Sequence, residues 1–220
     1  MPQAGHLEQA FHIFGYLKSH PKRKIGFDPS HPGINENRFQ KCDWEEFYRD
    51  ASEAIPENKP EARGKSMSTH CFVDANHAGD TETRRSQTGI LLFCNKAPTM
   101  WFSKRQNSVE ASTFGSEFTT MKNAVEMIEA LRYKLRMFGV PIEGPTNVFC
   151  DNEAVCKNMA RPESTLTKKH HSIAYHRSRE AVAAGTVRVS KEDTLTNLAD
   201  IFTKTMAAPK RENLLDSFTY

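Results

Sequence analysis

The longest regular pattern of hydrophobic positions extends over residues 114–138. Its apolar residues recur every three or four positions, which places them on one face of an α-helix. They are Phe114, Phe118, Met121, Val125, Ile128, Leu131, Leu135 and Phe138. Ser112 or Thr113 can cap the start of this helix, and Gly139 and Pro141 end it. The pattern therefore predicts a long helix with one buried face.

Short apolar runs on both sides of this helix predict a β-sheet. Five strands are expected, at residues 68–74, 89–94, 99–103, 146–150 and 186–190. The first three are joined by short turns and should be antiparallel, whereas the fourth follows a helical crossover and should be parallel. Further helices are predicted at 152–160, 167–184 and 196–205. This order gives an α/β fold in which helices pack on a mixed five-stranded sheet.

A less regular region precedes the first strand. Residues 5–19 predict a helix whose apolar face carries Leu7, Ala10, Phe11, Phe14 and Leu17. A short strand at 24–27 and a helix at 44–54 are expected next, followed by a polar linker at 55–66. We therefore predict an N-terminal segment at 1–66, one domain at 67–206 and a C-terminal tail at 207–220.

The composition excludes some classes of protein. No apolar run reaches the roughly 18 residues of a membrane span, and the N-terminus lacks the basic-then-apolar layout of a secretory signal. The five cysteines have no CxxC spacing, and Cys71, Cys94 and Cys150 lie in strand-like runs. We therefore expect buried thiols in a reducing compartment, no membrane association and no secretion.

The formal net charge of +3 does not by itself indicate a nucleic-acid ligand. Basic residues are nevertheless clustered beside the predicted strands and helices, at Arg84–Arg85, Lys104–Arg105, Lys168–Lys169 and Arg177 with Arg179. Each cluster alone is more typical of a solvated surface. Together they favour a polyanionic substrate.

Four acidic residues lie at the ends or starts of predicted elements. Asp74 and Asp151 end strands, Glu117 lies in the first turns of the long helix, and Asp200 lies in the last helix. Four carboxylates brought together would repel one another unless cations joined them. The pattern suits two hard divalent ions held by oxygen ligands, an arrangement used to cut phosphodiesters. Each acid alone also fits a turn, a helix cap or a helix surface.

Six stretches of the sequence resemble the ribonuclease H domain of copia-type retrotransposon Pol polyproteins. They occur in the family's order between about residues 70 and 206, at 72–80, 101–106, 112–118, 150–152, 169–180 and 199–204. Residues 6–18 also resemble the stretch that follows the reverse transcriptase palm in such polyproteins. The resemblance implies that the chain is a C-terminal piece of such a polyprotein.

The resemblance also implies a fold, an activity and a set of ligands. The fold would be ribonuclease H-like, and the reaction would be hydrolysis of the RNA strand of an RNA–DNA hybrid during reverse transcription. Asp74, Glu117, Asp151 and Asp200 would bind two Mg²⁺ ions, with Mn²⁺ as an alternative, and would be the catalytic residues. The expected partners are the hybrid and the upstream reverse transcriptase domain. The expected location is a cytoplasmic virus-like particle, with the nucleus as an alternative.

Several polar residues near these motifs are candidates for contact with the hybrid. They are Arg85, Lys104, Arg105, Gln106, Asn152, Lys169, His170 and His176. Asn152 can instead cap the next helix, and His176 can instead pack that helix against the sheet. Trp101 is expected in the core. Many ribonucleases H carry a mobile histidine about ten residues before the last acid, where this sequence has Ser190.

Two other functions remain open from the sequence. The chain could be a catalytically silent remnant that binds nucleic acid or a partner protein. It could also be an integrase or transposase of similar fold, but these enzymes have the acid order Asp, Asp, Glu, whereas the glutamate here is second. We therefore favour the hybrid-cleaving ribonuclease.

Overall fold

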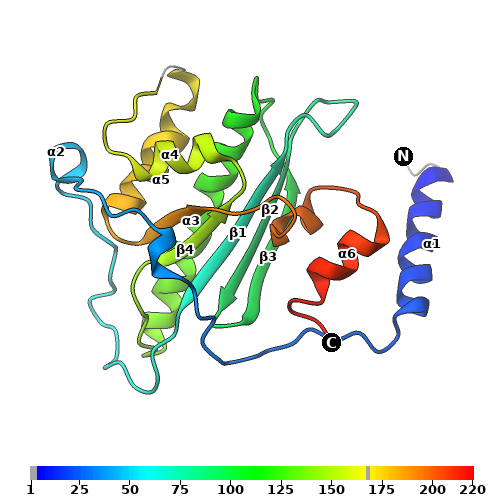
Figure 1. Cartoon of the computed structure of the whole chain (residues 1–220), viewed down its shortest axis with the longest axis horizontal. Helices are drawn as coiled ribbons and strands as arrows, with labels where there is room; N and C mark the ends of the chain where they lie inside the picture. The colour runs from blue at the N-terminus through cyan, green and yellow to red at the C-terminus, as the bar shows by residue number, and fades with distance from the viewer. Residues whose placement is uncertain (1–3, 167–168) are drawn as a thin grey trace.

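The protein is built around a five-stranded sheet with the strand order β3-β2-β1-β4-β5. A computed structural model describes residues 4–166 and 169–220 (Figure 1). The strands are β1 (Thr69–Asn76), β2 (Gln87–Cys94), β3 (Ala97–Arg105), β4 (Thr146–Cys150) and β5 (Val187–Lys191). β2 is antiparallel to β1 and β3, whereas β4 is parallel to β1 and β5. The predicted α/β fold, a mixed five-stranded sheet with three antiparallel strands followed by parallel ones, is confirmed.

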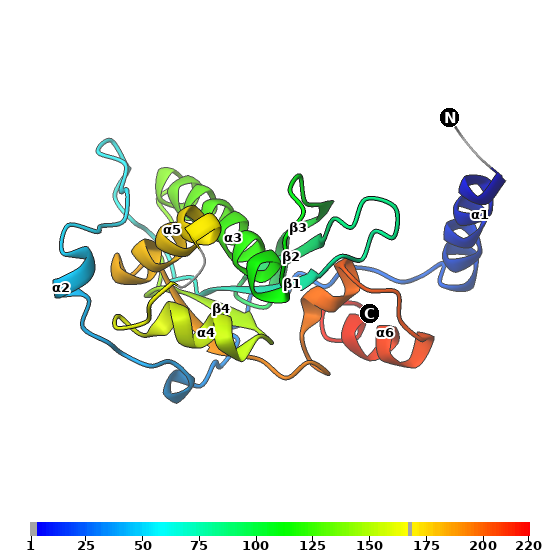
Figure 2. The same ribbon diagram turned by 90° about the horizontal axis from the view of Figure 1, so that it is seen from above.

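One face of the sheet is covered by three helices that share its main core. These are α3 (Thr113–Met137), α4 (Glu153–Ala160) and α5 (Ser172–Ala183), of which α3 and α5 lie side by side (Figure 2). Phe118, Val125 and Ile128 of α3 are fully buried against Val73 and Val148 of the sheet. Ser112 caps α3 as expected, because its side chain accepts a hydrogen bond from the Gly115 amide. The main core therefore lies between α3 and the sheet.

The opposite face is covered by the C-terminal segment. A 3₁₀ helix, η3 (Leu198–Phe202), is followed by α6 (Ala208–Leu215). Leu91 and Phe93 of β2 pack with Leu198 of η3 and Leu214 of α6 in a second, smaller core. An α-helix over 196–205 was expected in place of η3, and α6 was not predicted. Alternate side chains of β2 thus enter different cores, which fixes η3 against the sheet.

The N-terminal segment follows the surface of the molecule. It contains α1 (Ala4–Ser19), the 3₁₀ helix η1 (Glu36–Arg38) and α2 (Glu45–Tyr48). The predicted strand at 24–27 is an isolated bridge between Ile25 and Thr219, and the predicted helix at 44–54 is a single turn. The predicted helix at 167–184 is divided into η2 (Lys169–His171) and α5. No helix in the described ranges is long and apolar enough to cross a membrane.

Ion pairs attach this segment to the domain, largely buried ones at Glu53 and a more exposed one at Glu36. Glu53 accepts hydrogen bonds from Arg132 and Arg136 of α3, at 2.6 and 2.5 Å from its Oε1 atom. The two guanidinium groups outweigh partial burial and hold the pKa of Glu53 below its usual value. Glu36 pairs with Arg188 of β5. The stretch between η1 and β1 is therefore held at its start by Glu36 and near its middle by Glu53.

Candidate metal centre

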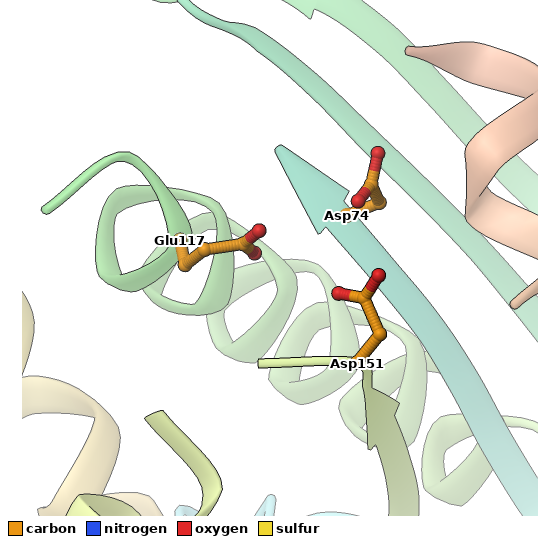
Figure 3. Close-up of side chains that lie close together, drawn as sticks. All are labelled: Asp74, Glu117 and Asp151. Carbon is orange, nitrogen blue, oxygen red and sulfur yellow. The ribbon is translucent and has the colours of Figure 1, made fainter. Parts of the chain in front are cut away.

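Three of the four predicted acids meet at one end of the sheet. Asp74 lies on β1, Asp151 directly follows β4, and Glu117 lies in the second turn of α3. Val73 of β1 is the register partner of Cys150 of β4, so the two following aspartates lie on adjacent parallel strands. Their carboxylates and that of Glu117 point toward one another (Figure 3), and one ligand oxygen from each lies within 4.8 Å of the others. We call these residues the three-carboxylate cluster.

Burial makes the negative charge of this cluster costly. Glu117 and Asp74 are 3% and 1% exposed. Burial, and then the charges of Asp74 and Asp151, raise the pKa of Glu117 well above its usual value. Burial also raises the pKa of Asp74, although hydrogen bonds from Thr203 and Lys204 oppose this rise. A cation bound among these oxygens would relieve both penalties.

The donor atoms of the cluster fit a hard divalent cation. All three side chains offer carboxylate oxygens, the ligands that Mg²⁺ and Mn²⁺ prefer. The Oε2 atom of Glu117 is buried and has no hydrogen-bond partner among the described residues. An orphaned buried carboxylate oxygen is costly unless a ligand satisfies it. The residues present therefore fit the ion or ions that the resemblance implies.

Asp200, the fourth predicted acid, lies beside this cluster and is paired with two lysines. It is fully buried on η3. The Nζ atom of Lys204 lies 2.6 Å from Oδ1 of Asp200, and that of Lys210 lies 2.7 Å from Oδ2. Lys204 also reaches Oδ1 of Asp74, at 3.0 Å. Burial alone would lower the pKa of Lys204, but the two carboxylates outweigh it and raise that pKa.

Gly89 allows η3 to approach the sheet closely enough for Lys204 to reach Asp74. It is the β2 register partner of Asp74. A Cβ atom at this position would lie 2.5 Å from Cγ2 of Thr203 and 2.8 Å from the carbonyl oxygen of Ala199. Asn197 fixes η3 from its other end by donating to the Val73 carbonyl at 3.0 Å. Gly89 and Asn197 thus place Thr203 and Lys204 close to Asp74 on β1.

Three of the candidate substrate contacts line a groove between β3 and α3. Lys104, Arg105 and Gln106 are among its walls, and its volume is about 560 Å³. Arg85 and Arg105 line a second hollow of about 490 Å³ that also includes Lys204. Gln106 is buried and donates to the Ser116 carbonyl at 2.9 Å, so its amide group is used within the domain. Lys104 and Arg105 are exposed.

The remaining candidates lie on α4, η2 and α5. Asn152 caps α4, accepting from the amides of Ala154 and Val155. Lys169 is exposed on η2, and the side chain of His170 lies outside the part of the chain that the structure describes. His176 is exposed, and its Nδ1 atom lies 2.7 Å from the hydroxyl of Tyr48 in α2. His176 therefore contacts the N-terminal segment.

Two expectations about large side chains are wrong. Arg179, assigned to a basic surface cluster, is buried on α5 beneath the rings of Trp44 and Tyr175 and donates to the Pro162 carbonyl at 2.6 Å. Trp101, expected in the core, is 55% exposed because β3 is an edge strand and this residue points away from α3's side. Arg179 is therefore a packing residue, and Trp101 belongs to the surface.

The sequence did not assign a role to Thr203 or Lys204. Thr203 donates a hydrogen bond to Oδ2 of Asp74, and Lys204 joins Asp74 to Asp200. The spacing of Asp200 and Lys204, four residues apart, is a signal that could have indicated their pairing. Their contact with Asp74 depends on the approach of η3 to β1, which no local pattern reports.

The sequence is similar to polyproteins of plant transposons. It is 29% identical over 151 residues, 69% of its length, to the retrovirus-related Pol polyprotein from transposon RE2 of Arabidopsis thaliana. It is 31% identical over 142 residues, 64% of its length, to the corresponding polyprotein from transposon TNT 1-94 of Nicotiana tabacum. Each match covers 10% of the polyprotein, so the chain spans about a tenth of the length of these relatives. No protein-family model matches the chain.

Solved structures of ribonucleases H are also similar to this chain. LC11-RNase H1 in complex with an RNA/DNA hybrid has a TM-score of 0.49 and 12% identity, over 62% of this chain and 94% of that one. The N-terminal RNase H domain of Rv2228c from Mycobacterium tuberculosis has a TM-score of 0.48 and 10% identity, over 69% of this chain and 99% of that one.

Proposed function

Because the chain is homologous to retrovirus-related Pol polyproteins of plant transposons and has a ribonuclease H-like fold, we propose that it hydrolyses the RNA strand of RNA–DNA hybrids during retrotransposon reverse transcription. The observation that carries this proposal is the three-carboxylate cluster at the end of β1 and β4. The reverse transcriptase domain of the same polyprotein is the proposed upstream partner.

The proposed centre would bind divalent cations through residues from four parts of the fold, namely β1, α3, the end of β4 and η3. Asp74, Glu117 and Asp151 would hold the first ion, and Asp74 with Asp200 would offer oxygens for a second. Mg²⁺ is the proposed ion, with Mn²⁺ as a substitute of similar ligand preference. Ions held there would supply an activated water and stabilise the leaving oxygen of the scissile phosphodiester. The packed ends of β1, β4 and α3 preorganise Asp74, Glu117 and Asp151, so little reorganisation of these carboxylates would be needed for the first ion to bind.

Cations near the cluster, exposed at Lys104 and Arg105 and half-buried at Arg85, support a polyanionic substrate. Lys104 and Arg105 lie at the end of β3, and Arg85 lies in the loop between β1 and β2. Arg85 and Arg105 line a hollow that Lys204 shares, which places positive charge next to Asp74. Such cations bind phosphates and position a duplex without reading its sequence.

The test is a cleavage assay on four matched oligonucleotide substrates. The RNA strand of an RNA–DNA hybrid should be cut in the presence of Mg²⁺ and left intact with a chelator. Single-stranded RNA, duplex RNA and duplex DNA of the same sequence should be cut much more slowly. Binding of the hybrid without cleavage would favour a catalytically silent nucleic-acid-binding module, and cleavage of duplex DNA would contradict the proposal.

A further inference from the structure

Lys204 occupies the space between two buried acids at the proposed centre. Its ammonium group lies 3.0 Å from Oδ1 of Asp74 and 2.6 Å from Oδ1 of Asp200. Asp74 is also a member of the three-carboxylate cluster, so it is shared between that cluster and this bridge. The acids of the site therefore form two groups. In the three-carboxylate cluster, Oε2 of Glu117 has no hydrogen-bond partner among the described residues, whereas Asp74 and Asp200 already share the ammonium group of Lys204.

The two acids and the lysine differ in their freedom to move. The side chains of Asp74 and Asp200 are 2% and 0% exposed, and both are fixed by further contacts with Thr203 and Lys210. The side chain of Lys204 is 34% exposed. A lysine has a long flexible stem and a strongly hydrated head, so it can withdraw into solvent while the acids stay in place.

We propose that Lys204 is an internal competitor for one of the two divalent cations. The first ion binds to Asp74, Glu117 and Asp151, and a second ion can bind between Asp74 and Asp200 only by displacing the ammonium group of Lys204. This inference takes from the proposed function only the assumption that the centre holds two divalent ions. In the absence of substrate the chain then binds one divalent ion well and a second one weakly.

The competition follows from charge at close range. An ammonium group within hydrogen-bond distance of both carboxylates stabilises their charges and opposes the approach of another cation. After displacement, Asp200 keeps the contact of its Oδ2 atom with Lys210, at 2.7 Å. Lys210 makes no contact with Asp74 among the described residues, so it holds Asp200 without closing the place between the two acids.

The first experiment measures Mn²⁺ binding by calorimetry and by the electron paramagnetic resonance of free Mn²⁺. The parent chain should bind one ion, with a second at least tenfold weaker. Lys204→Met, which removes the ammonium group and keeps a flexible apolar stem, should bind the second ion at least tenfold more tightly than the parent. Lys204→Arg keeps the charge and should resemble the parent. Lys122→Met removes a lysine paired with Glu126 on α3 and is the control for net charge.

The second experiment uses the unaltered chain and so does not depend on the folding of a variant. Lysine labelling followed by mass spectrometry is performed with a chelator and with saturating Mn²⁺. Labelling of Lys204 should accelerate several-fold with Mn²⁺, whereas that of Lys122 should not change. Unchanged labelling of Lys204, or equal Mn²⁺ binding by Lys204→Met and the parent, would overturn the proposal. Both measurements are made without nucleic acid, so an absence of hybrid cleavage would refute the proposed function without affecting this result.

Discussion

At the residue scale, the packing of the fold holds the three-carboxylate cluster together although its negative charges repel one another. Asp151 contributes to the repulsion, because its charge helps to raise the pKa of Glu117. Thr203 and Lys204 compensate Asp74 but do not contact Asp151 among the described residues. The charge of Asp74 raises the pKa of Glu117 more than that of Asp151 does, but Asp74 is also held by Thr203 and Lys204. A substitution at Asp151 therefore removes repulsion on Glu117 without breaking those two contacts.

Asp151→Asn is expected to abolish hybrid cleavage while the chain stays folded. Asparagine keeps the shape of the side chain and removes a charge that a cation needs. In the presence of a chelator its melting temperature should equal or exceed that of the parent, since repulsion is relieved. Parallel thermal melts and cleavage assays test this. Asp50→Asn, at an exposed aspartate, is the matched control. Metal-dependent cleavage by Asp151→Asn at the parent's rate would refute the role of Asp151.

His70 predicts a pH dependence of stability that is separate from the metal centre. Burial lowers the pKa of His70 to about 4, and its ring is stacked on Phe93 with the ring centroids 4.6 Å apart. The unfolded chain binds this proton more readily than the folded one, so the contribution of neutral His70 is complete above the unfolded pKa of about 6.5. It is lost as pH falls from about 6.5 to about 4.

His70→Phe should remove this dependence, because phenylalanine keeps the stacking and cannot be protonated. Between pH 7.5 and pH 4 the free energy of unfolding of the parent should fall by about 3 kcal/mol more than that of the variant. Chemical denaturation at several pH values measures the difference. Parallel pH profiles for the two proteins would show that His70 does not titrate as a buried neutral base.

At the element scale, the position of η3 determines whether Asp200 and Lys204 reach the end of β1. The approach depends on Gly89, where an added Cβ atom would lie 2.5 Å from Cγ2 of Thr203. The nearby carbonyl of Ala199 is a backbone atom and cannot rotate away. A side chain at this position must therefore push η3 from the sheet.

Gly89→Ala is expected to destabilise the domain by about 1–3 kcal/mol, the usual cost of overpacking. It should also weaken binding of the second divalent ion, because Asp200 moves with η3 away from Asp74. Urea denaturation and Mn²⁺ calorimetry measure the two effects. Gly15→Ala, in α1 where an added Cβ atom has no neighbour within 4 Å, should change neither. A fully stable Gly89→Ala variant with unchanged ion binding would show that η3 is not held in this way.

The sequence predicts best the elements that have one buried face, because their apolar residues then recur at a regular spacing. The α3 helix has a cap at Ser112 and eight apolar residues at helical spacing, and its bounds agree closely with the expectation. By contrast, η3 and α6 have few apolar residues, and their cores are completed by β2. Their type and position depend on contacts with the opposite face of the sheet, which no local periodicity reports.

At the scale of the whole molecule, the apolar face of α1 has little cover. Leu7, Phe11, Phe14 and Leu17 are 55–66% exposed, and α1 lies apart from the sheet beside α6 (Figure 1). Its contacts with the C-terminal segment include the guanidinium of Arg211, which lies over the ring of Tyr16. An apolar surface of this kind promotes association.

We therefore expect the chain to self-associate at micromolar concentrations, and Phe11→Glu with Phe14→Glu to shift it toward the monomer. Multi-angle light scattering over a concentration series measures this. Phe138→Glu places the same charge at another exposed phenylalanine, at the end of α3, and should not alter the molar mass. A parent chain that is monomeric at every concentration would show that this face does not drive association.

Across the whole site, the sequence could indicate the three members of the cluster. It could not indicate that Asp200, unlike them, is paired with two lysines. Asp74, Glu117 and Asp151 lie at the ends or starts of elements with clear patterns, so topology alone brings them together. Asp200 is bound to two lysines, and that arrangement depends on a tertiary contact through Gly89. The lysine bridge could therefore be found only in the folded chain.

The most direct test of the metal centre compares the parent with Glu117→Gln in cleavage of the RNA strand of a labelled RNA–DNA hybrid. Glutamine keeps the size of Glu117 and removes its charge, so both proteins should be folded by circular dichroism. The parent should cleave with Mg²⁺ and stop with a chelator, and Glu117→Gln should be slower by roughly a hundredfold or more, a loss comparable to removing one preorganised electrostatic group. Equal rates for the two proteins, or cleavage that continues in chelator, would contradict catalysis at this cluster.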